Sequence, residues 1–343
     1  MTPPDGILQP GKLPVELLGR MLRKYAVYDD RVLIGPGTGR DSAALRFGDS
    51  ALVVKTDPIT FPTDRPAHHL IHVNANDIAC QGAVPRWLLV TALLPHGSTT
   101  AETVETLFAD LTAESEKIGV KVIGGHTEIT IGLERPILVG TMLGETSLDG
   151  LIDPALAKPG DRLLMTRTAG IEGTVLLANA MRTQLLTDCA VPAASIDVAA
   201  TYLHEPGISV LKEARALADA GIVSAMHDPT EGGVATALRE LAIAANCGVV
   251  VSRDAIGLTD ETRVISEALG IDPLGLLASG SLLAAVPRER LESAANVLDG
   301  IGVPFAWIGK LTPPDAGMRL RSGASEMDLP EFAVDEVARI LAG

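Results

Sequence analysis

The chain has 343 residues, of which 47% are hydrophobic and 21% charged, so it can bury a sizeable core and is not a disordered protein. Its formal net charge of −15 argues against binding to nucleic acid or to an anionic membrane surface. No apolar run approaches the ~20 residues of a membrane span, and the sequence opens without a basic-then-apolar leader. Its three cysteines are far apart in sequence and odd in number. We therefore expect a soluble cytoplasmic protein without disulfides.

The first half of the chain predicts alternating helices and strands. An amphipathic helix is expected from residue 10, with Val15, Leu18 and Leu22 on one face. A second helix is expected over residues 65–83. A third is expected to start after the cap residues 98–100 and to end at Gly119. Strands are expected at 43–47, 51–56, 86–95, 120–123 and 137–145, and residues 124–129 are expected to form a loop.

A connection rich in Pro, Gly and Asp, "DPALAKPGD", indicates a domain boundary near residues 150–160. We therefore expect one domain over residues 1–155 and a second over 156–343. The second half repeats the strand–helix pattern, and the tail from 330 to 341 predicts a single amphipathic helix. Order and lengths of these elements indicate α/β or α+β layers.

Three polar motifs in the first half could carry chemistry. "GPGTGRD" places Gly37 and Gly39 ahead of Asp41, and glycines let backbone N–H groups approach phosphate. In "KTDPIT", Asp57 ends an apolar strand, where α/β sheets meet their ligands. The alternative interpretation of the first motif is a tight turn ahead of a strand, and the simpler interpretation of the second is a capping or turn Asp before Pro58.

The third motif lies in the segment that looks most like a core helix. "HVNANDIACQGAVPRW" carries Asn74, Asn76 and Asp77 within four positions. A buried carboxylate is costly unless it is paired or bound to a metal. A structural cap accounts for one polar residue here but poorly for three.

Two further motifs contain glycine pairs. In "GGHTEIT", Gly124 and Gly125 free the backbone beside His126, Thr127 and Glu128, although a β-turn with an exposed histidine is the simpler interpretation. The other motif is "HDPTEGG", which precedes an amphipathic helix whose backbone N–H groups could bind an anion. Its candidate residues are Asp228, Thr230, Gly232 and Gly233, and an ordinary N-cap is the alternative.

Two features are interpreted as structural. His68 and His72 have the i, i+4 spacing of zinc ligands, but the Glu of an HExxH motif is missing and no other Cys/His cluster lies nearby in sequence. Cys189 has no identifiable base. By contrast, the acids Asp41, Asp57 and Asp77 together with glycine-rich segments favour Mg²⁺ bridging carboxylates to a nucleotide's phosphates.

Taken in order and spacing, "GRDSAAL", "VKTDPIT", "HVNANDIACQGAVP", "GGHTEIT" and "HDPTEGG" resemble the PurM-like ATP-binding superfamily. Its members include aminoimidazole ribonucleotide synthetase, HypE, thiamine-monophosphate kinase and selenophosphate synthetase. The resemblance covers about residues 12–320. It is greatest to HypE-like hydrogenase expression/formation proteins, through "HDPTEGGVATALRELA" and "LGIDPLGLLASG".

The resemblance implies two α/β domains, the first forming a barrel across a homodimer and binding ATP with Mg²⁺. Asp41, Asp57 and Asp77 match the family's metal-binding acids, with Asn76 beside them. Gly124, Gly125, His126, Thr127 and Glu128 match its glycine loop, and Asp228, Thr230, Gly232 and Gly233 match its second phosphate loop. Asp41, Asp77 and His126 are the catalytic candidates.

The resemblance also implies an ATP-dependent enzyme that activates an oxygen of a small amide- or carboxyl-type substrate by phosphorylation. The substrate is diffusible or is carried by a partner. Alternatives are a small-molecule kinase of the thiamine-monophosphate kinase type and a non-catalytic nucleotide-binding maturation partner. Two departures bear on hydrogenase maturation: Glu231 stands where HypE has Arg, and the sequence ends "ARILAG" without a terminal cysteine.

Overall fold

A computed structural model describes residue 8, residues 11–25 and residues 29–342, which form two compact units. The N-terminal unit contains residues 29–35 and Asp41–Leu151. The C-terminal unit contains the described residues up to Tyr25, the segment Pro36–Arg40, and residues 152–342. Each unit has its own β-sheet and its own hydrophobic core.

The N-terminal unit is built on a six-stranded sheet in the order β1-β2-β3-β6-β4-β5. Only β4 and β5 pair in parallel; the other neighbours are antiparallel. The strands are β1 (Val32–Ile34), β2 (Ala43–Phe47), β3 (Ser50–Ile59), β4 (Val84–Pro95), β5 (Lys121–Thr130) and β6 (Ile137–Ser147).

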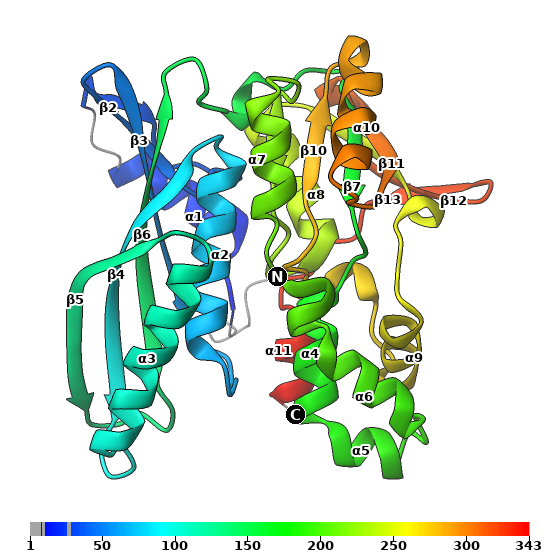
Figure 1. The fold of residues 1–343 in the computed structure, drawn as a ribbon. Coiled ribbons are helices and arrows are strands. Elements are labelled where there is room, and N and C mark those ends of the chain that lie inside the picture. The colour runs from blue at the N-terminus through cyan, green and yellow to red at the C-terminus, as the bar shows by residue number, and fades with distance from the viewer. Residues whose placement is uncertain (1–7, 9–10, 26–28, 343) are drawn as a thin grey trace. The chain divides into compact units, whose positions relative to one another are not determined.

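Two helices lie on the same side of this sheet, as Figure 1 shows. Helix α2 (Pro66–Cys80) starts with a proline at its first turn and packs against β3, β4 and β6, where its apolar residues join the core. Helix α3 (Ala101–Lys117) packs against α2 and β5, and the Thr100 hydroxyl accepts a hydrogen bond from the N–H of Thr103 at its start. Along much of β3, β4 and β6 alternate residues are buried, whereas those between them are half-buried or exposed.

The C-terminal unit is built on a seven-stranded sheet in the order β13-β12-β9-β11-β7-β10-β8. Its strands are β7 (Arg162–Thr166), β8 (Ala225–His227), β9 (Gly248–Ser252), β10 (Leu283–Val286), β11 (Phe305–Thr312), β12 (Met318–Ser322) and β13 (Ser325–Asp328). Only β9 and β12 pair in parallel.

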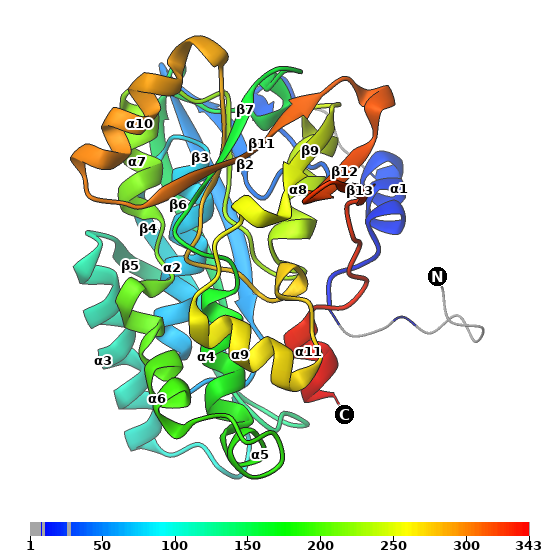
Figure 2. The same cartoon turned by 90° about the vertical axis from the view of Figure 1, so that its right-hand side faces the viewer.

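The helices of this unit are α1 (Val15–Tyr25), α4 (Ile171–Ala180), α5 (Arg182–Thr187), α6 (Ala193–Thr201), α7 (Leu211–Asp219), α8 (Gly233–Ala244), α9 (Asp260–Leu269), α10 (Leu291–Gly300) and α11 (Glu336–Leu341). Helix α8 packs on β8 and β9 and supplies much of the core through its alanines and leucines. Helices α4, α6 and α9 contact one another, and α7 lies beside α10, as Figure 2 shows.

The mixed α/β fold expected from the sequence is confirmed, but several local expectations are wrong. Asp57 lies within β3 and is paired with Gly140, instead of ending the strand. Residues 124–129 continue β5 instead of forming a loop. The tail helix begins only at Glu336, because the Asp335 side chain caps it by accepting a hydrogen bond from the N–H of Val337. The first helix also starts later than expected: Pro10 lies outside the described residues, but residues 11–14 are not helical and α1 begins at Val15.

Within the described part of the chain, no helix is both long enough and apolar enough to cross a membrane. In the same residues, Cys80, Cys189 and Cys247 form no disulfide.

Candidate functional site

The candidate site of the N-terminal unit centres on a lysine that the sequence motifs did not single out. The Lys55 ammonium lies 3.0 Å from Oδ2 of Asp77 and 3.5 Å from Oδ2 of Asp57. Lys55 and Asp57 are two residues apart on β3, so they project from the same face, while Asp77 reaches them from α2. The i, i+2 spacing in "VKTDP" was the signal that could have revealed Lys55.

The charges around Lys55 set its protonation. Burial alone would lower the pKa of Lys55, but the carboxylates of Asp77, Asp57 and Asp41 outweigh it and raise the pKa well above its ordinary value. The three predicted acids therefore all act on one buried ammonium. Counted by themselves, these three carboxylates and the ammonium carry a formal charge of −2, and a divalent cation is the kind of ion that acidic clusters bind.

The buried polar residues of α2 now have specific roles. Asn74 is fully buried, and its side-chain amide donates a 2.8 Å hydrogen bond to the carbonyl of Leu70. It packs over Gly140 of β6, where a Cβ would lie 2.8 Å from the Asn74 amide nitrogen. Asn76 is also fully buried, and Asp77 is only 4% exposed. Asn74 is thus structural, whereas Asp77 belongs to the charged cluster with Lys55.

The glycine segment Pro36–Arg40 belongs to the C-terminal unit. Gly39 has a φ of +72°, and a Cβ there would lie 2.1 Å from the backbone oxygen of Glu240 in α8. Glycine at this position is therefore required by close packing against a helix as well as by backbone conformation. Arg40 anchors the same segment through an ion pair with Asp153, 3.3 Å away.

In the Gly124–Gly125 pair, only Gly125 is required by strand packing. Gly125 has a φ of +148°, and a Cβ would lie 1.8 Å from the carbonyl oxygen of Val90 on the neighbouring strand. The residues that follow are exposed, and His126 pairs with Glu128 at 3.0 Å. That hydrogen bond is the main cause that lowers the pKa of Glu128.

The "DPTEGG" segment forms the start of α8 in the C-terminal unit. Gly232 and Gly233 both have positive φ, and a Cβ on Gly233 would lie 2.4 Å from the carbonyl oxygen of Leu274. Asp228 is 1% exposed, and the Thr230 hydroxyl accepts a 3.3 Å hydrogen bond from the Lys12 ammonium. This part of the motif is a tightly packed helix start.

A carboxylate from the C-terminal tail already lies on this helix start. The backbone N–H of Gly232 donates a 2.8 Å hydrogen bond to Oδ2 of Asp335, and Val337 donates one of 2.7 Å to Oδ1. Burial raises the pKa of Asp335 to about 7, opposed by these two N–H groups and reinforced by the charges of Glu231 and Glu172. The Asp335 carboxyl group of the tail therefore occupies the amide of Gly232 at the start of α8.

A second polar cluster in the N-terminal unit lies outside the predicted nucleotide residues. His68 and His72 of α2 face Glu114 of α3. Burial lowers the pKa of His72 to about 4, so its imidazole is neutral at physiological pH. Burial would raise the pKa of Glu114, but hydrogen bonds from Lys117 and His68 lower it to about 2.

Models of two domains match the chain: the N-terminal domain of AIR synthase related proteins over residues 39–146, and the C-terminal domain over residues 158–319. The chain belongs to the AIR synthase related family, and its two units have the PurM-like fold that the sequence motifs predicted. More particularly, it is similar to HypE: it is 28% identical to carbamoyl dehydratase HypE of Rhodobacter capsulatus over 336 residues, which is 94% of this chain and 91% of that protein.

Solved structures agree on the fold. The hydrogenase maturation protein HypE in complex with ATP has a TM-score of 0.70 at 23% identity, covering 94% of this chain and 91% of that chain. Thiamine monophosphate kinase from Aquifex aeolicus has a TM-score of 0.65 at 18% identity, covering 92% of this chain and 97% of that chain.

Proposed function

We propose that this protein is an ATP-dependent enzyme that phosphorylates an oxygen of a small amide- or carboxyl-type substrate. The observation that carries the proposal is the ion-pair cluster of Lys55 with Asp77 and Asp57, 3.0 Å and 3.5 Å away, on whose ammonium the charge of Asp41 also acts, in a chain that belongs to the AIR synthase related family. The likeness to a HypE that binds ATP and to relatives named carbamoyl dehydratases supports both the nucleotide and the substrate class.

In this proposal Asp41, Asp57 and Asp77 would hold Mg²⁺, because their oxygens are the hard ligands that this ion prefers. Bound Mg²⁺ would neutralise negative charge on the phosphates of ATP. Lys55 holds the carboxylates in place between turnovers and donates hydrogen bonds to them. Asn76, together with Gly124, Gly125, His126, Thr127 and Glu128 and with Gly37 and Gly39, completes the proposed nucleotide-binding set. Asp228, Thr230, Gly232 and Gly233 form the proposed second phosphate loop.

The reaction requires positioning and charge neutralisation and needs no covalent nucleophile on the protein. The carbonyl oxygen of the substrate attacks the γ-phosphorus of ATP, and ADP leaves with the electrons of the broken P–O bond. The phosphorylated oxygen is then a good leaving group. Displacement or elimination releases inorganic phosphate and completes the activation.

The test is Mg²⁺-ATP binding by calorimetry together with phosphate release. Asp77→Asn should weaken Mg²⁺-ATP binding at least tenfold with an unchanged circular dichroism spectrum, because it removes a buried ligand charge. Asp49→Asn is the matched control, since Asp49 is an exposed acid in the turn between β2 and β3 of the same unit. Unchanged affinity in Asn variants of all three acids would refute the site, and nucleotide binding without any turnover would favour a non-catalytic maturation partner.

A second candidate function is a small-molecule kinase, which the likeness to thiamine monophosphate kinase favours. The two functions differ in where the γ-phosphate ends. Incubation with ATP labelled in the γ-phosphate and a pool of metabolites should release free phosphate in the first case. A stable phosphorylated product would identify a kinase.

We also propose that the N-terminal unit dimerises into a barrel. In this proposal residues 1–155 and 156–343 are an ATP-binding half and a second half by function, because α1 and Pro36–Arg40 within the first range pack with the C-terminal unit. The support is apolar surface on β5, where Val122, Ile123 and Ile129 are 41%, 56% and 51% exposed. Light scattering should give the mass of a dimer, and Ile123→Asp should give a monomer. A monomeric wild-type protein at micromolar concentration would exclude the dimer.

A further inference from the structure

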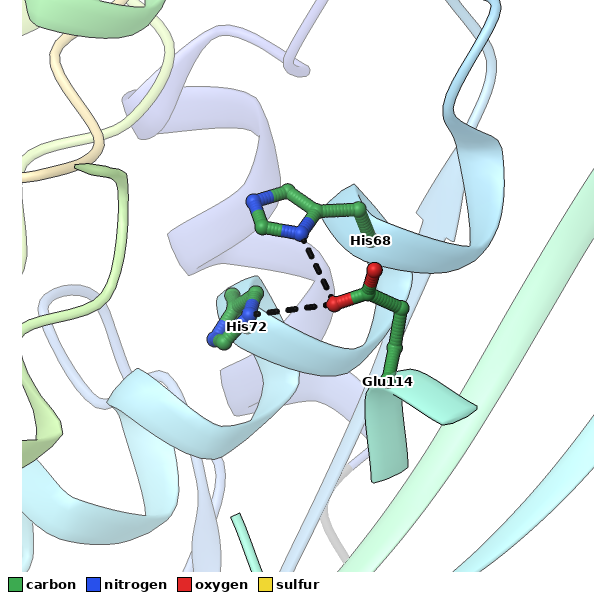
Figure 3. A group of neighbouring side chains, drawn as sticks. All are labelled: His68, His72 and Glu114. Carbon is green, nitrogen blue, oxygen red and sulfur yellow. Dashed lines mark hydrogen bonds and ion pairs between the residues drawn. The ribbon is translucent and has the colours of Figure 1, made fainter. Parts of the chain in front are cut away.

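Helices α2 and α3 place three metal-binding side chains together in the N-terminal unit. The ligand atoms of His68, His72 and Glu114 all lie within 4.8 Å of one another, and all three residues are buried. In Figure 3 both imidazole rings turn toward the same carboxylate oxygen of Glu114. Within residues 11–25 and 29–342, no other group of three His, Cys, Asp or Glu side chains brings its ligand atoms this close together.

The distances suit ligands that share one ion. Nδ1 of His68 lies 3.0 Å from Oε2 of Glu114, and Nε2 of His72 lies 3.8 Å from the same oxygen. Two ligands of a tetrahedral zinc ion, each about 2.0–2.1 Å from the metal, are about 3.3 Å apart. The two measured distances fall on either side of this value. The longer one exceeds a hydrogen bond, so hydrogen bonding does not account for the position of the His72 ring.

The three residues occupy positions where a core would ordinarily hold apolar side chains. His68 and His72 are one turn apart on the same face of α2, and each is 7% exposed. Glu114 is 2% exposed and shares the buried face of α3 with Leu111 and Ser115. A buried carboxylate between two buried imidazoles is costly to retain for packing alone.

The second oxygen of Glu114 is already occupied by other partners. Arg65 and Lys117 lie 3.2 Å and 2.9 Å from Oε1. These contacts fix the carboxylate so that Oε2 points to the histidines, as partners of metal-ligating carboxylates commonly do. The two cations oppose a metal ion electrostatically, so we expect an affinity in the micromolar range rather than tighter.

We propose that His68, His72 and Glu114 bind one divalent transition-metal ion of the zinc type. Two imidazoles and a carboxylate suit Zn²⁺ and disfavour Mg²⁺, which prefers oxygen ligands alone. The fourth position is left for water or another donor. The ion would join α2 to α3 and so fix the helix that carries Asn76 and Asp77. This site is separate from the proposed nucleotide site and does not depend on it.

The experiment is a titration of the full chain, purified with chelator, with Co²⁺ and then Zn²⁺ in the presence of excess Mg²⁺. We expect one Co²⁺ to bind per chain and to give the intense visible absorption of four-coordinate cobalt. Zn²⁺ should displace the Co²⁺ and abolish this absorption. His72→Gln and Glu114→Gln should each weaken binding at least tenfold. His96→Ala, which removes an exposed histidine of the same unit, should bind as the wild type does, and so should Asp77→Asn.

Two results would overturn the proposal: the absence of stoichiometric binding by the wild type, or equal affinity in His72→Gln. Because a substituted core histidine could unfold the chain, X-ray absorption of the zinc-loaded wild type provides a second test. It should show scattering from two imidazoles. A zinc environment of oxygen atoms alone would place the ion elsewhere and refute the site.

Discussion

The carboxylate of Asp335 gives a quantitative prediction about pH. This side chain is 7% exposed and accepts hydrogen bonds from Gly232 and Val337, yet burial still raises its pKa to about 7. The folded protein therefore holds this proton more tightly than the unfolded chain does. The resulting stabilisation is complete below about pH 4 and is lost as the pH rises through about 7.

The magnitude follows from the two pKa values. A change from the ordinary 3.8 to about 7 corresponds to about 4 kcal/mol in the free energy of unfolding, as an upper limit. Asp335→Asn removes the titration and keeps an oxygen for one of the two amides. We expect the variant to differ from the wild type by less than about 1.5 kcal/mol near pH 4. Between about pH 4 and pH 8 the free energy of unfolding of the variant should rise by roughly 3–4 kcal/mol relative to that of the wild type.

Urea denaturation of both proteins across this pH range measures the difference. Because other groups titrate equally in both, the difference isolates Asp335. Asp315→Asn serves as the control, since this acid is exposed in the same unit. The reasoning would be refuted if the free energy of unfolding of Asp335→Asn did not increase relative to that of the wild type as the pH rises.

Three further predictions concern packing and charge, all measured by urea denaturation. Gly39→Ala should lower the free energy of unfolding by about 2 kcal/mol or more, because the new Cβ clashes with α8. Gly48 also has a positive φ but open space around it, so Gly48→Ala should lower the free energy of unfolding by only about 1 kcal/mol. Equal losses would contradict the packing argument. Glu213→Ala should lower the free energy of unfolding by about 3–5 kcal/mol, because it leaves the partly buried Arg167 without the fully buried carboxylate that lies 3.0 Å away. A loss below about 1 kcal/mol would show that solvent replaces the pair. Lys55→Met should lower the free energy of unfolding by about 3 kcal/mol, because it leaves the carboxylates of Asp57 and Asp77 without their ammonium. Added Mg²⁺ should recover part of this loss. A stability that responds neither to chelator nor to Mg²⁺ would contradict the role of charge in this cluster.

The helices and most strands of the N-terminal unit could be predicted because their signals are local. Pro66 opens α2, Thr100 caps α3, and alternation marks the strands. The extension of β5 through Gly124 and Gly125 was not predictable, because glycine usually interrupts a strand. Here the neighbouring strand at Val90 approaches so closely that only glycine fits, and that approach is a tertiary property.

The candidate sites divide in the same way. Asp57 and Asp77 are recognisable as carboxylates in apolar segments, and the i, i+2 spacing pairs Lys55 with Asp57, but the contact of Lys55 with Asp77 exists only when β3 and α2 pack together. The spacing of His68 and His72 was visible in the sequence, yet their third partner lies on a different helix. Nothing in the local pattern around Glu114 distinguishes it from the exposed glutamates of α3.

The chain path between the two units has a consequence for protein engineering. Helix α1 and the segment Pro36–Arg40 belong to the same unit as residues 152–342, so the N-terminal unit is inserted within the sequence of the other. A fragment that starts near residue 156 would lack the segment that places Gly39 against the Glu240 carbonyl and would leave the end of α8 without that cover. Independent expression of the C-terminal unit therefore calls for a redesigned connection that retains α1 and Pro36–Arg40 and replaces the inserted unit with short linkers.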